Sequence, residues 1–365
     1  MMFKKLNFQS DIIRHFAPGW FASVMGTAVL VIAIFVFQDA IPLAKFWQIF
    51  FLSLAGLMFV VIFIPWILRW LIYFQQVKAD LDHPVFGAFY PTMPISLIII
   101  GIALEKAGPL FLSEAVLLPS LQFLWITGTA GIAYFAITIL NINFLKPDLK
   151  WDIANMGWLI PPVSALIVPI LGSSLSVAYA GTTLGEINFI ASLIFLGIGS
   201  LLFIFVMGAI FTRYLFHDLL PAHLAPTIWI GIAPTSILTI IAIKLVNPIT
   251  VFFDISKEVA AVLGVISKVI GLSMWGFALF WVVLVVFVTA HHHKKIAIPF
   301  AMSWWAFTFP LGSFIVATGL IHKVIGGAFF QWVGLSALTG LIIIWCMVSI
   351  RTLRAVISGE IFKPA

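Results

Sequence analysis

Charged side chains are scarce in this sequence of 365 residues. Only 9% of the residues are Asp, Glu, Lys or Arg, whereas 63% are hydrophobic. A soluble protein cannot bury so much apolar surface, so the composition predicts a chain that crosses a membrane many times. The net charge of +6 is interpreted as a cytoplasmic bias of Lys and Arg and not as a nucleic-acid-binding signal. With one cysteine, Cys346, the chain has no internal disulfide bond.

Acidic and catalytic residues are also missing from the middle of the long apolar stretches. Every Asp and Glu falls at the end of such a stretch or between two of them. This excludes a cation pathway built on rings of carboxylates and a proton relay of buried acids. The chain also lacks a His-Glu-x-x-His motif, paired membrane aspartates and a mid-membrane histidine. We therefore expect no enzymatic activity, no metal site and no cofactor.

Ten stretches are long enough to cross a hydrocarbon core about 30 Å thick. Together they form a single transmembrane domain, 1–365, with an all-α fold. The predicted spans are 15–38, 46–74, 86–104, 115–144, 153–178, 187–216, 224–246, 265–293, 297–320 and 325–353. Of the 19 Lys and Arg residues, 13 fall on the side of both termini and six on the other side. The positive-inside rule then predicts a multi-pass protein of the cell membrane with cytoplasmic N- and C-termini.

Prolines recur in the odd-numbered spans at a nearly constant spacing. Pro18, Pro94, Pro162, Pro234 and Pro310 are separated by 76, 68, 72 and 76 residues, which is about one helical hairpin. A proline inside a helix removes a backbone hydrogen bond, and the carbonyl that it frees needs a partner that lipid does not supply. The repeat therefore predicts five hairpins, with bent odd-numbered helices inside around an axis and straighter even-numbered helices outside.

Hydroxyl side chains close to these prolines are the predicted lining of that axis. The predicted kinks are Pro94, Pro162, Pro234 and Pro310, and the predicted lining residues are Thr27, Ser96, Ser164, Ser236, Thr308 and Ser313. The alternative for any one hydroxyl is a hydrogen bond to its own helix backbone. A neutral lining with hydroxyl donors favours anions over cations.

Phe309, beside Pro310, either closes the axis as an apolar gate or packs between helices, and composition alone favours packing.

Three segments carry a resemblance to a known family. They are HFAPGWFASVMGTAVL (15–30), HPVFGAFYPTMPIS (83–96) and WWAFTFPLGSFIVAT (304–318). Together they resemble the tellurite-resistance/dicarboxylate transporter family, which includes plant slow anion channels, bacterial tellurite-resistance proteins, and fungal malate carriers and sulfite exporters. The resemblance covers essentially the whole chain. It implies five hairpins in a quasi-fivefold arrangement around a central pore, a homotrimer with one pore in each protomer, and a pore blocked by Phe309.

Two functions remain open from the sequence. The first is an anion channel or facilitator that passes small inorganic or organic anions across the bilayer through a neutral, hydroxyl-lined pore gated by Phe309. The second is a proton-coupled secondary transporter of C4-dicarboxylates such as malate, or a sulfite exporter. The absence of a central carboxylate means that proton coupling would need a histidine or the substrate's own proton.

Overall fold

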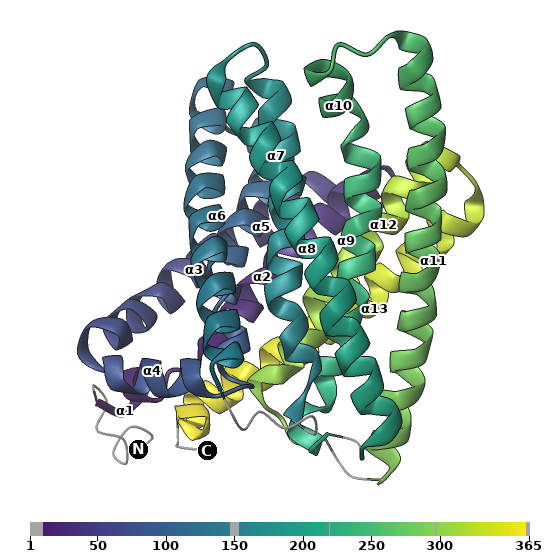
Figure 1. Ribbon diagram of the computed structural model, residues 1–365. Coiled ribbons are helices and arrows are strands. Elements are labelled where there is room, and N and C mark those ends of the chain that lie inside the picture. Colours follow the sequence, from purple (N-terminus) through teal and green to yellow (C-terminus); the bar gives the residue numbers. More distant parts are fainter. Residues whose placement is uncertain (1–9, 147–152, 219, 296–297, 363–365) are drawn as a thin grey trace.

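The computed structural model describes residues 10–146, 153–218, 220–295 and 298–362, which form helices and no strands (Figure 1). Within these ranges ten helical segments are long and apolar enough to cross a membrane. They are Pro18–Val36, Ala44–Ile72, Gly87–Leu110, Glu114–Phe144, Met156–Ala178, Thr183–Phe216, Ala222–Lys244, Lys257–Lys294, Met302–Ile325 and Ala328–Ser358. The all-α class and the number of spans predicted from the sequence are confirmed.

Five helices form a closed inner ring. They are α2 (Phe21–Val36), α5 (Thr92–Ala107), α7 (Ile160–Ala178), α9 (Ile232–Lys244) and α12 (Thr308–Ile325). Each packs against the next inner helix along the chain, and α12 returns to pack against α2. Each also packs against the outer helix that follows it, namely α3 (Ala44–Ile72), α6 (Glu114–Phe144), α8 (Thr183–Phe216), α11 (Lys257–Lys295) and α13 (Ala328–Ser358). This order is consistent with five hairpins in a quasi-fivefold arrangement.

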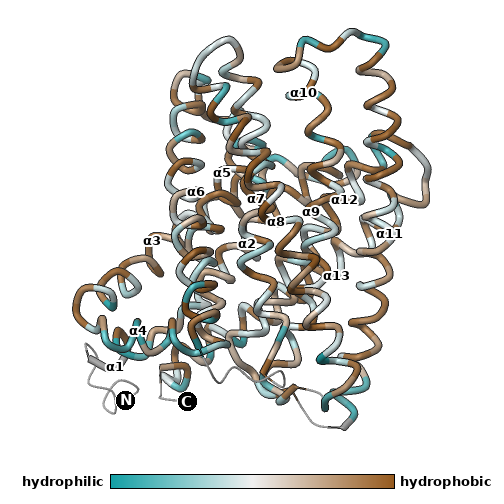
Figure 2. Tube along the Cα trace, viewed as in Figure 1, coloured by the Kyte–Doolittle hydropathy of each residue, from teal (hydrophilic) through white to brown (hydrophobic). Residues whose placement is uncertain are grey.

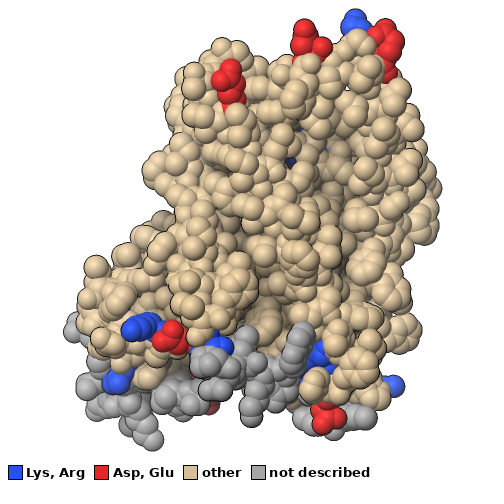
Figure 3. All heavy atoms as spheres, in the orientation of Figure 1, with Lys and Arg blue, Asp and Glu red and all other residues tan. Residues whose placement is uncertain are grey.

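Burial separates the inner helices from the outer ones. Between 72% and 89% of the most apolar window of each inner span is buried inside the protein, against 22% to 33% for the outer spans. The outer helices therefore present apolar side chains to lipid along most of their length, which Figure 2 shows as long hydrophobic stretches. Figure 3 shows the complementary pattern, since charged groups on the face in view gather mainly at the two ends of the molecule. The inner ring is shielded from lipid by this outer layer.

The shorter helices distinguish the two ends of the molecule. We call one the α4 end, because α4 (Phe74–Asp82) and α1 (Ser10–Arg14) lie there, and the other the α10 end, after α10 (Val246–Phe252) (Figure 1). Helix α10 and the first turns of α11 fall largely between the seventh and eighth predicted spans, 224–246 and 265–293. Apolar residues at helical spacing extend α11 beyond the predicted start of its span.

The prolines of the repeat lie at a change of helix type. Pro94, Pro162, Pro234 and Pro310 are each the third residue of an inner α-helix. A 3₁₀ segment precedes the α-helix in every inner span: η1 (Pro18–Trp20), η3 (Gly87–Phe89), η6 (Met156–Leu159), η7 (Ala222–Gly231) and η8 (Met302–Phe307). The first N–H groups of an α-helix have no acceptor within the helix, so proline costs no hydrogen bond there. The structure thus places the four prolines just after junctions between 3₁₀ and α segments.

A buried arginine fixes the α4 end. Arg69, near the end of α3, pairs with Asp80 of α4 at 2.6 Å. Its guanidinium also donates to the carbonyls of Arg14 and Phe16, at 3.0 and 2.9 Å. One side chain therefore joins α3, α4 and the segment that leads into α2, and a buried charge with this many partners is compensated.

Two glycines allow α12 to close the ring against α2. A methyl group at Gly26 would lie 2.1 Å from Oγ1 of Thr308, and one at Gly312 would lie 2.5 Å from Cγ1 of Val29. Both distances are far below van der Waals contact, so these glycines set how closely the two helices approach. Thr308 consequently packs into the contact between α12 and α2.

Replacing Gly26 by alanine should destabilise the protein, because overpacking a close contact costs about 1–3 kcal/mol. Thermal unfolding in detergent, followed by tryptophan fluorescence, should show a lower midpoint for Gly26→Ala than for the wild type. The matched control is Gly208→Ala on α8, where a methyl group has no neighbour within 4 Å. An unchanged midpoint in Gly26→Ala would contradict the close approach of α2 and α12.

Candidate functional site

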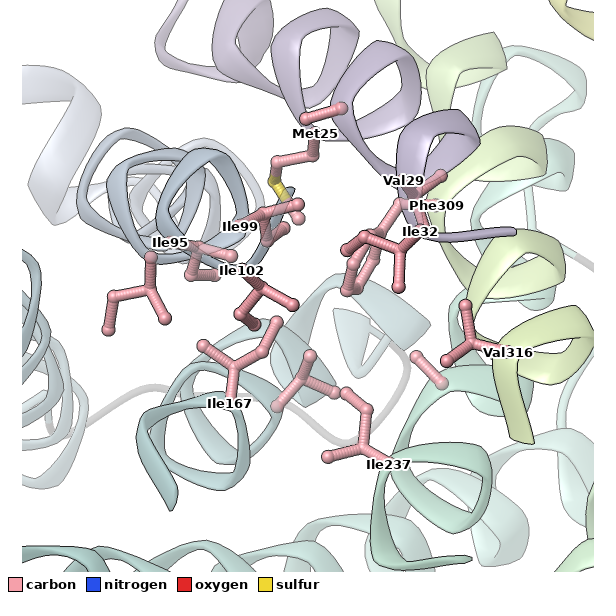
Figure 4. Packing of buried hydrophobic residues seen from close by; sticks show 14 of the residues in the cluster. Met25, Val29, Ile32, Ile95, Ile99, Ile102, Ile167, Ile237, Phe309 and Val316 are labelled. Carbon is pink, nitrogen blue, oxygen red and sulfur yellow. The ribbon is translucent and has the colours of Figure 1, made fainter. Parts of the chain in front are cut away.

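The axis of the inner ring is lined by one face of each inner helix. On α12 this face consists of Phe309, Ser313, Val316 and Leu320, which are spaced by three or four residues as one side of an α-helix requires. Figure 4 looks at the same region from close by and shows Phe309, Met25, Ile99 and Ile237 among the labelled side chains that converge between the helices. The lining is therefore built from the same position in each of five hairpins.

The lining residues form three tiers of five equivalent positions. Tier 1 is Met25, Ile95, Val163, Ala233 and Phe309; tier 2 is Val29, Ile99, Ile167, Ile237 and Ser313; tier 3 is Ile32, Ile102, Ile170, Ile240 and Val316. In each tier, successive members are 70, 68, 70 and 76 residues apart in the chain. Fourteen of these fifteen side chains carry no polar group other than the sulfur of Met25, and Ser313 is the exception. Along these three tiers the axis is thus apolar as well as uncharged.

Two cavities lie along this axis, and Phe309 borders both. The larger has a volume of about 210 Å³ and extends from Phe309 toward the α10 end. The smaller, of about 40 Å³, lies toward the 3₁₀ segments and is bordered by Phe89 and Met302. No other residue belongs to the lining of both cavities. Phe309, which is 6% exposed, is also the one aromatic residue of tier 1, and its ring stands between the two hollows.

The predicted hydroxyls have a different position from the one that the sequence suggested. Each donates a hydrogen bond to a carbonyl three or four residues earlier in its own span, at 2.6 to 3.0 Å: Thr27 to Ser23, Ser96 to Met93, Ser164 to Pro161, Ser236 to Ile232, Thr308 to Trp305 and Ser313 to Phe309. Only Ser313 borders the larger cavity. The expectation of a hydroxyl-lined conduit is therefore corrected to an aliphatic one.

Helical geometry explains this correction. Ser96 and Ser164 directly follow the tier 1 residues Ile95 and Val163, and Ser236 directly precedes the tier 2 residue Ile237. One residue along an α-helix rotates the side chain by about 100°, so these hydroxyls point away from the axis. The inner helices are apolar on every side, so no periodicity in the sequence marks the lining face.

A ring of lysines at the α10 end was missed from the sequence. Lys106, Lys244 and Lys323 lie in the last turns of α5, α9 and α12 and border the larger cavity. The ammonium groups of Lys106 and Lys323 lie 5.4 and 5.3 Å from the centre of the Phe35 ring, a cation–π arrangement. We call these three lysines the lysine mouth. In the sequence they mark only the ends of spans, and their convergence depends on the ring.

One carboxylate accompanies the lysine mouth. Glu105 places Oε1 3.3 Å from Nζ of Lys106 and Oε2 3.7 Å from Nζ of Lys244. Lys244 donates hydrogen bonds to the carbonyl of Ile170 and to Oγ of Ser174, both at 2.9 Å. Three cations and one anion leave this end of the conduit positive, which raises the local concentration of anions. Cations near helix C-termini also interact favourably with the helix dipoles.

Comparisons with known proteins agree with this geometry. A family model described as voltage-dependent anion channel matches residues 15–353. Two uncharacterized transporters of Methanocaldococcus jannaschii are similar to the chain, one 31% identical over 97% of both chains and one 32% identical over 96% of this chain and 98% of the relative. A sulfite efflux pump of Arthroderma otae is 24% identical over 96% of this chain and 93% of the pump.

Cysteine labelling distinguishes the tiers from the predicted hydroxyl lining. In a Cys346→Ser background, Val316→Cys should react with an anionic methanethiosulfonate, because Val316 borders the cavity that opens at the lysine mouth. Ser236→Cys should stay largely unmodified, because Ser236 is fully buried off the axis. Intact-mass spectrometry measures the modified fraction. Faster modification at residue 236 than at residue 316 would contradict the observed facing of the helices.

Proposed function

This chain belongs to the voltage-dependent anion channel family, and we propose that it passes small inorganic or organic anions along the axis of the inner ring, with the ring of Phe309 as the gate. The observation that carries the proposal is that Phe309 alone borders the cavities on both sides of tier 1. The ring stands between the two hollows and borders each of them. Moving one side chain then opens the conduit without moving a helix.

The apolar lining supports a gate of this kind. A narrow aliphatic passage closed by an aromatic ring excludes water, and an ion cannot cross it without losing its hydration shell. When the ring moves aside, the two cavities join and water can enter with the ion. Ser313, four residues after Phe309 on the same face, offers the single hydroxyl in tiers 1 to 3.

The charges at the conduit support anions over cations. The residues that line the larger cavity include three lysines and no Asp or Glu. A positive mouth concentrates anions and repels cations before either reaches the apolar tiers. The lysine mouth therefore selects ions by the sign of their charge. The apolar tiers then favour anions that lose their hydration water at low cost.

The proposal includes the orientation and the assembly predicted from the sequence. The N- and C-termini are cytoplasmic in the cell membrane, which the excess of 13 against six Lys and Arg residues supports. The lysine mouth then faces the outside. The assembly is a homotrimer with one conduit in each protomer, which rests on the resemblance of the three segments around residues 15–30, 83–96 and 304–318.

A coupled carrier is the second candidate. The likeness to a sulfite efflux pump over nearly the whole chain favours export of sulfite. The resemblance noted in the sequence adds proton-coupled transport of C4-dicarboxylates such as malate. Such a carrier would use the same conduit and the same ring, and would differ in moving a proton with each substrate. The substrate's own ionisable groups are one source of that proton.

Removing the ring of Phe309 should raise anion flux severalfold, since the two cavities would join. Planar-bilayer recording with anion substitution, on wild type and Phe309→Ala together, measures this. Phe314→Ala is the matched control, because Phe314 lies on the same helix and stacks on Trp275 at 5.8 Å, away from the conduit. Equal conductance in wild type and Phe309→Ala, with both eluting as folded protein, would remove Phe309 from the gate.

The channel and the carrier differ in their response to gradients. The channel predicts currents whose reversal potential follows the anion gradient and is independent of a pH difference. The carrier predicts that a pH difference alone drives sulfite or malate into proteoliposomes against its concentration gradient. Measuring both in one preparation decides between them, because uphill accumulation is impossible through an open channel.

A further inference from the structure

The lysine mouth and its single carboxylate form a second site on the conduit, distinct from the gate. Lys323 follows Phe309 by fourteen residues, about 21 Å of α-helix. We propose that Lys106, Lys244 and Lys323 form a binding site for one small oxyanion, and that Glu105 is an internal competitor that occupies this site until the oxyanion displaces it. The inference deepens the proposed function, on which it rests, by naming the class of anion that enters.

Glu105 lies between two lysines of the mouth, but its carboxylate leaves part of their hydrogen-bonding capacity unused. Its carboxylate bridges two helices, because Oε1 approaches Lys106 of α5 and Oε2 approaches Lys244 of α9. At 3.7 Å the second contact is too long for a hydrogen bond, and Oε2 has no hydrogen-bond partner among the described residues although it is buried. Lys244 directs its hydrogen bonds to Ile170 and Ser174 instead. Because Oε2 lacks a hydrogen bond, a free anion that satisfies both lysines can replace this carboxylate.

The third lysine of the mouth, Lys323, has no carboxylate as a partner in the described part of the chain. Among the residues that the structure describes, no carboxylate lies within salt-bridge distance of Lys323, and its ammonium contacts the Phe35 ring. Lys106 lies against the same ring, so Phe35 holds two ammonium groups at the mouth. With Glu105 in place the cluster keeps an excess of two positive charges. One anion from solution reduces that excess, and the attraction is strong where the groups are partly shielded from water.

A neighbouring cavity gives Glu105 room to move. A hollow of about 370 Å³ between α5, α6 and α7 is bordered by Glu105, Glu114, Ser174 and Leu118. The carboxylate of Glu105 therefore stands in the wall between this hollow and the lysine mouth. When an oxyanion takes its place beside Lys106 and Lys244, Glu105 can turn into the hollow while α5 stays where it is. Glu114, which faces the same hollow, opposes that movement by repulsion and keeps the competitor in place when no ligand is present.

The present occupant indicates the class of ligand. A carboxylate spreads one negative charge over two oxygens, and in Glu105 each oxygen faces a different lysine. Formate is the free counterpart of this group, and sulfite and nitrate likewise present several oxygens that share the charge. A halide has a single acceptor atom and cannot reproduce the bridge through two atoms. We therefore expect oxyanions to bind more tightly than chloride.

Direct binding measurements test the proposal without relying on transport. Isothermal titration of formate into the full-length protein in nanodiscs should give a dissociation constant that falls about tenfold in Glu105→Gln, since removing the competitor leaves the lysines unpaired. Lys323→Gln should bind about tenfold more weakly, and Lys323→Arg should restore most of the affinity. Lys257→Gln is the matched control, because Lys257 is exposed at the start of α11, outside the mouth.

Several outcomes would overturn the inference. An unchanged affinity in Glu105→Gln would show that Glu105 does not compete. If that variant does not fold, Lys323→Gln still decides the matter, because Lys323 is exposed and forms no salt bridge with any residue that the structure describes. An unchanged affinity in Lys323→Gln then means that the mouth is not the site. Equal affinities for formate and chloride would overturn the oxyanion class.

The same experiment separates this inference from the proposed function. Binding that follows the predicted order in a protein that carries no anion, with or without Phe309→Ala, would support the site and contradict the channel. Anion flux that depends on Phe309, together with formate binding that ignores Glu105 and Lys323, would support the channel and contradict the site.

Discussion

Hydrogen-bonding groups in the hydrocarbon core have no water available, so each must find its partner within the protein. This constraint decides how the inner helices are built. Serine and threonine hydroxyls near the repeat prolines bond to carbonyls of their own spans, and the prolines occupy first turns in which no N–H partner is lost. These hydroxyls are thereby satisfied within their own spans. What remains to face the axis is aliphatic.

Because the axis is aliphatic, two features control the passage of an ion in the proposed channel. They are the charge at the α10 end and the width of the axis at its centre. The lysines at the α10 end act before an ion enters, through the sign of their charge. The tiers act afterwards, since an ion between Ile and Val side chains has no group with which to replace its water. In the proposed channel a single residue, Phe309, is therefore enough for a gate, because the passage around it is already narrow and apolar. A gate in a hydrated, polar conduit would need a larger obstruction.

The sequence predicted the framework more fully than the site. Gaps between charged residues located ten spans, because an unpaired charge in hydrocarbon is costly at any rotation of the helix. The spacing of prolines separated inner spans from outer ones. The direction of each side chain could not be obtained in this way, because inner helices are apolar on every side and lack an amphipathic signal. Ser96 and Ile95 are adjacent in the chain, yet only the packing of α5 against α2 and α7 determines which of them faces the axis. The lysine mouth was missed for the same reason, since Lys106, Lys244 and Lys323 meet only when the ring closes.

The residues proposed to act on ions lie at positions where the fivefold repeat is broken. Tier 1 has Phe309 where the other inner helices have smaller, non-aromatic side chains, and tier 2 has Ser313 where they have Val or Ile, so α12 carries both exceptions. One step further along the repeat, the equivalent positions are Val36, Lys106, Ser174, Lys244 and Leu320, and here α5, α7 and α9 depart from the aliphatic pattern. Five identical helices would give a uniform apolar tube that could neither close at one point nor recognise an ion. The repeat supplies the apolar lining of the axis, and its few exceptions give that axis the proposed gate and a charged end.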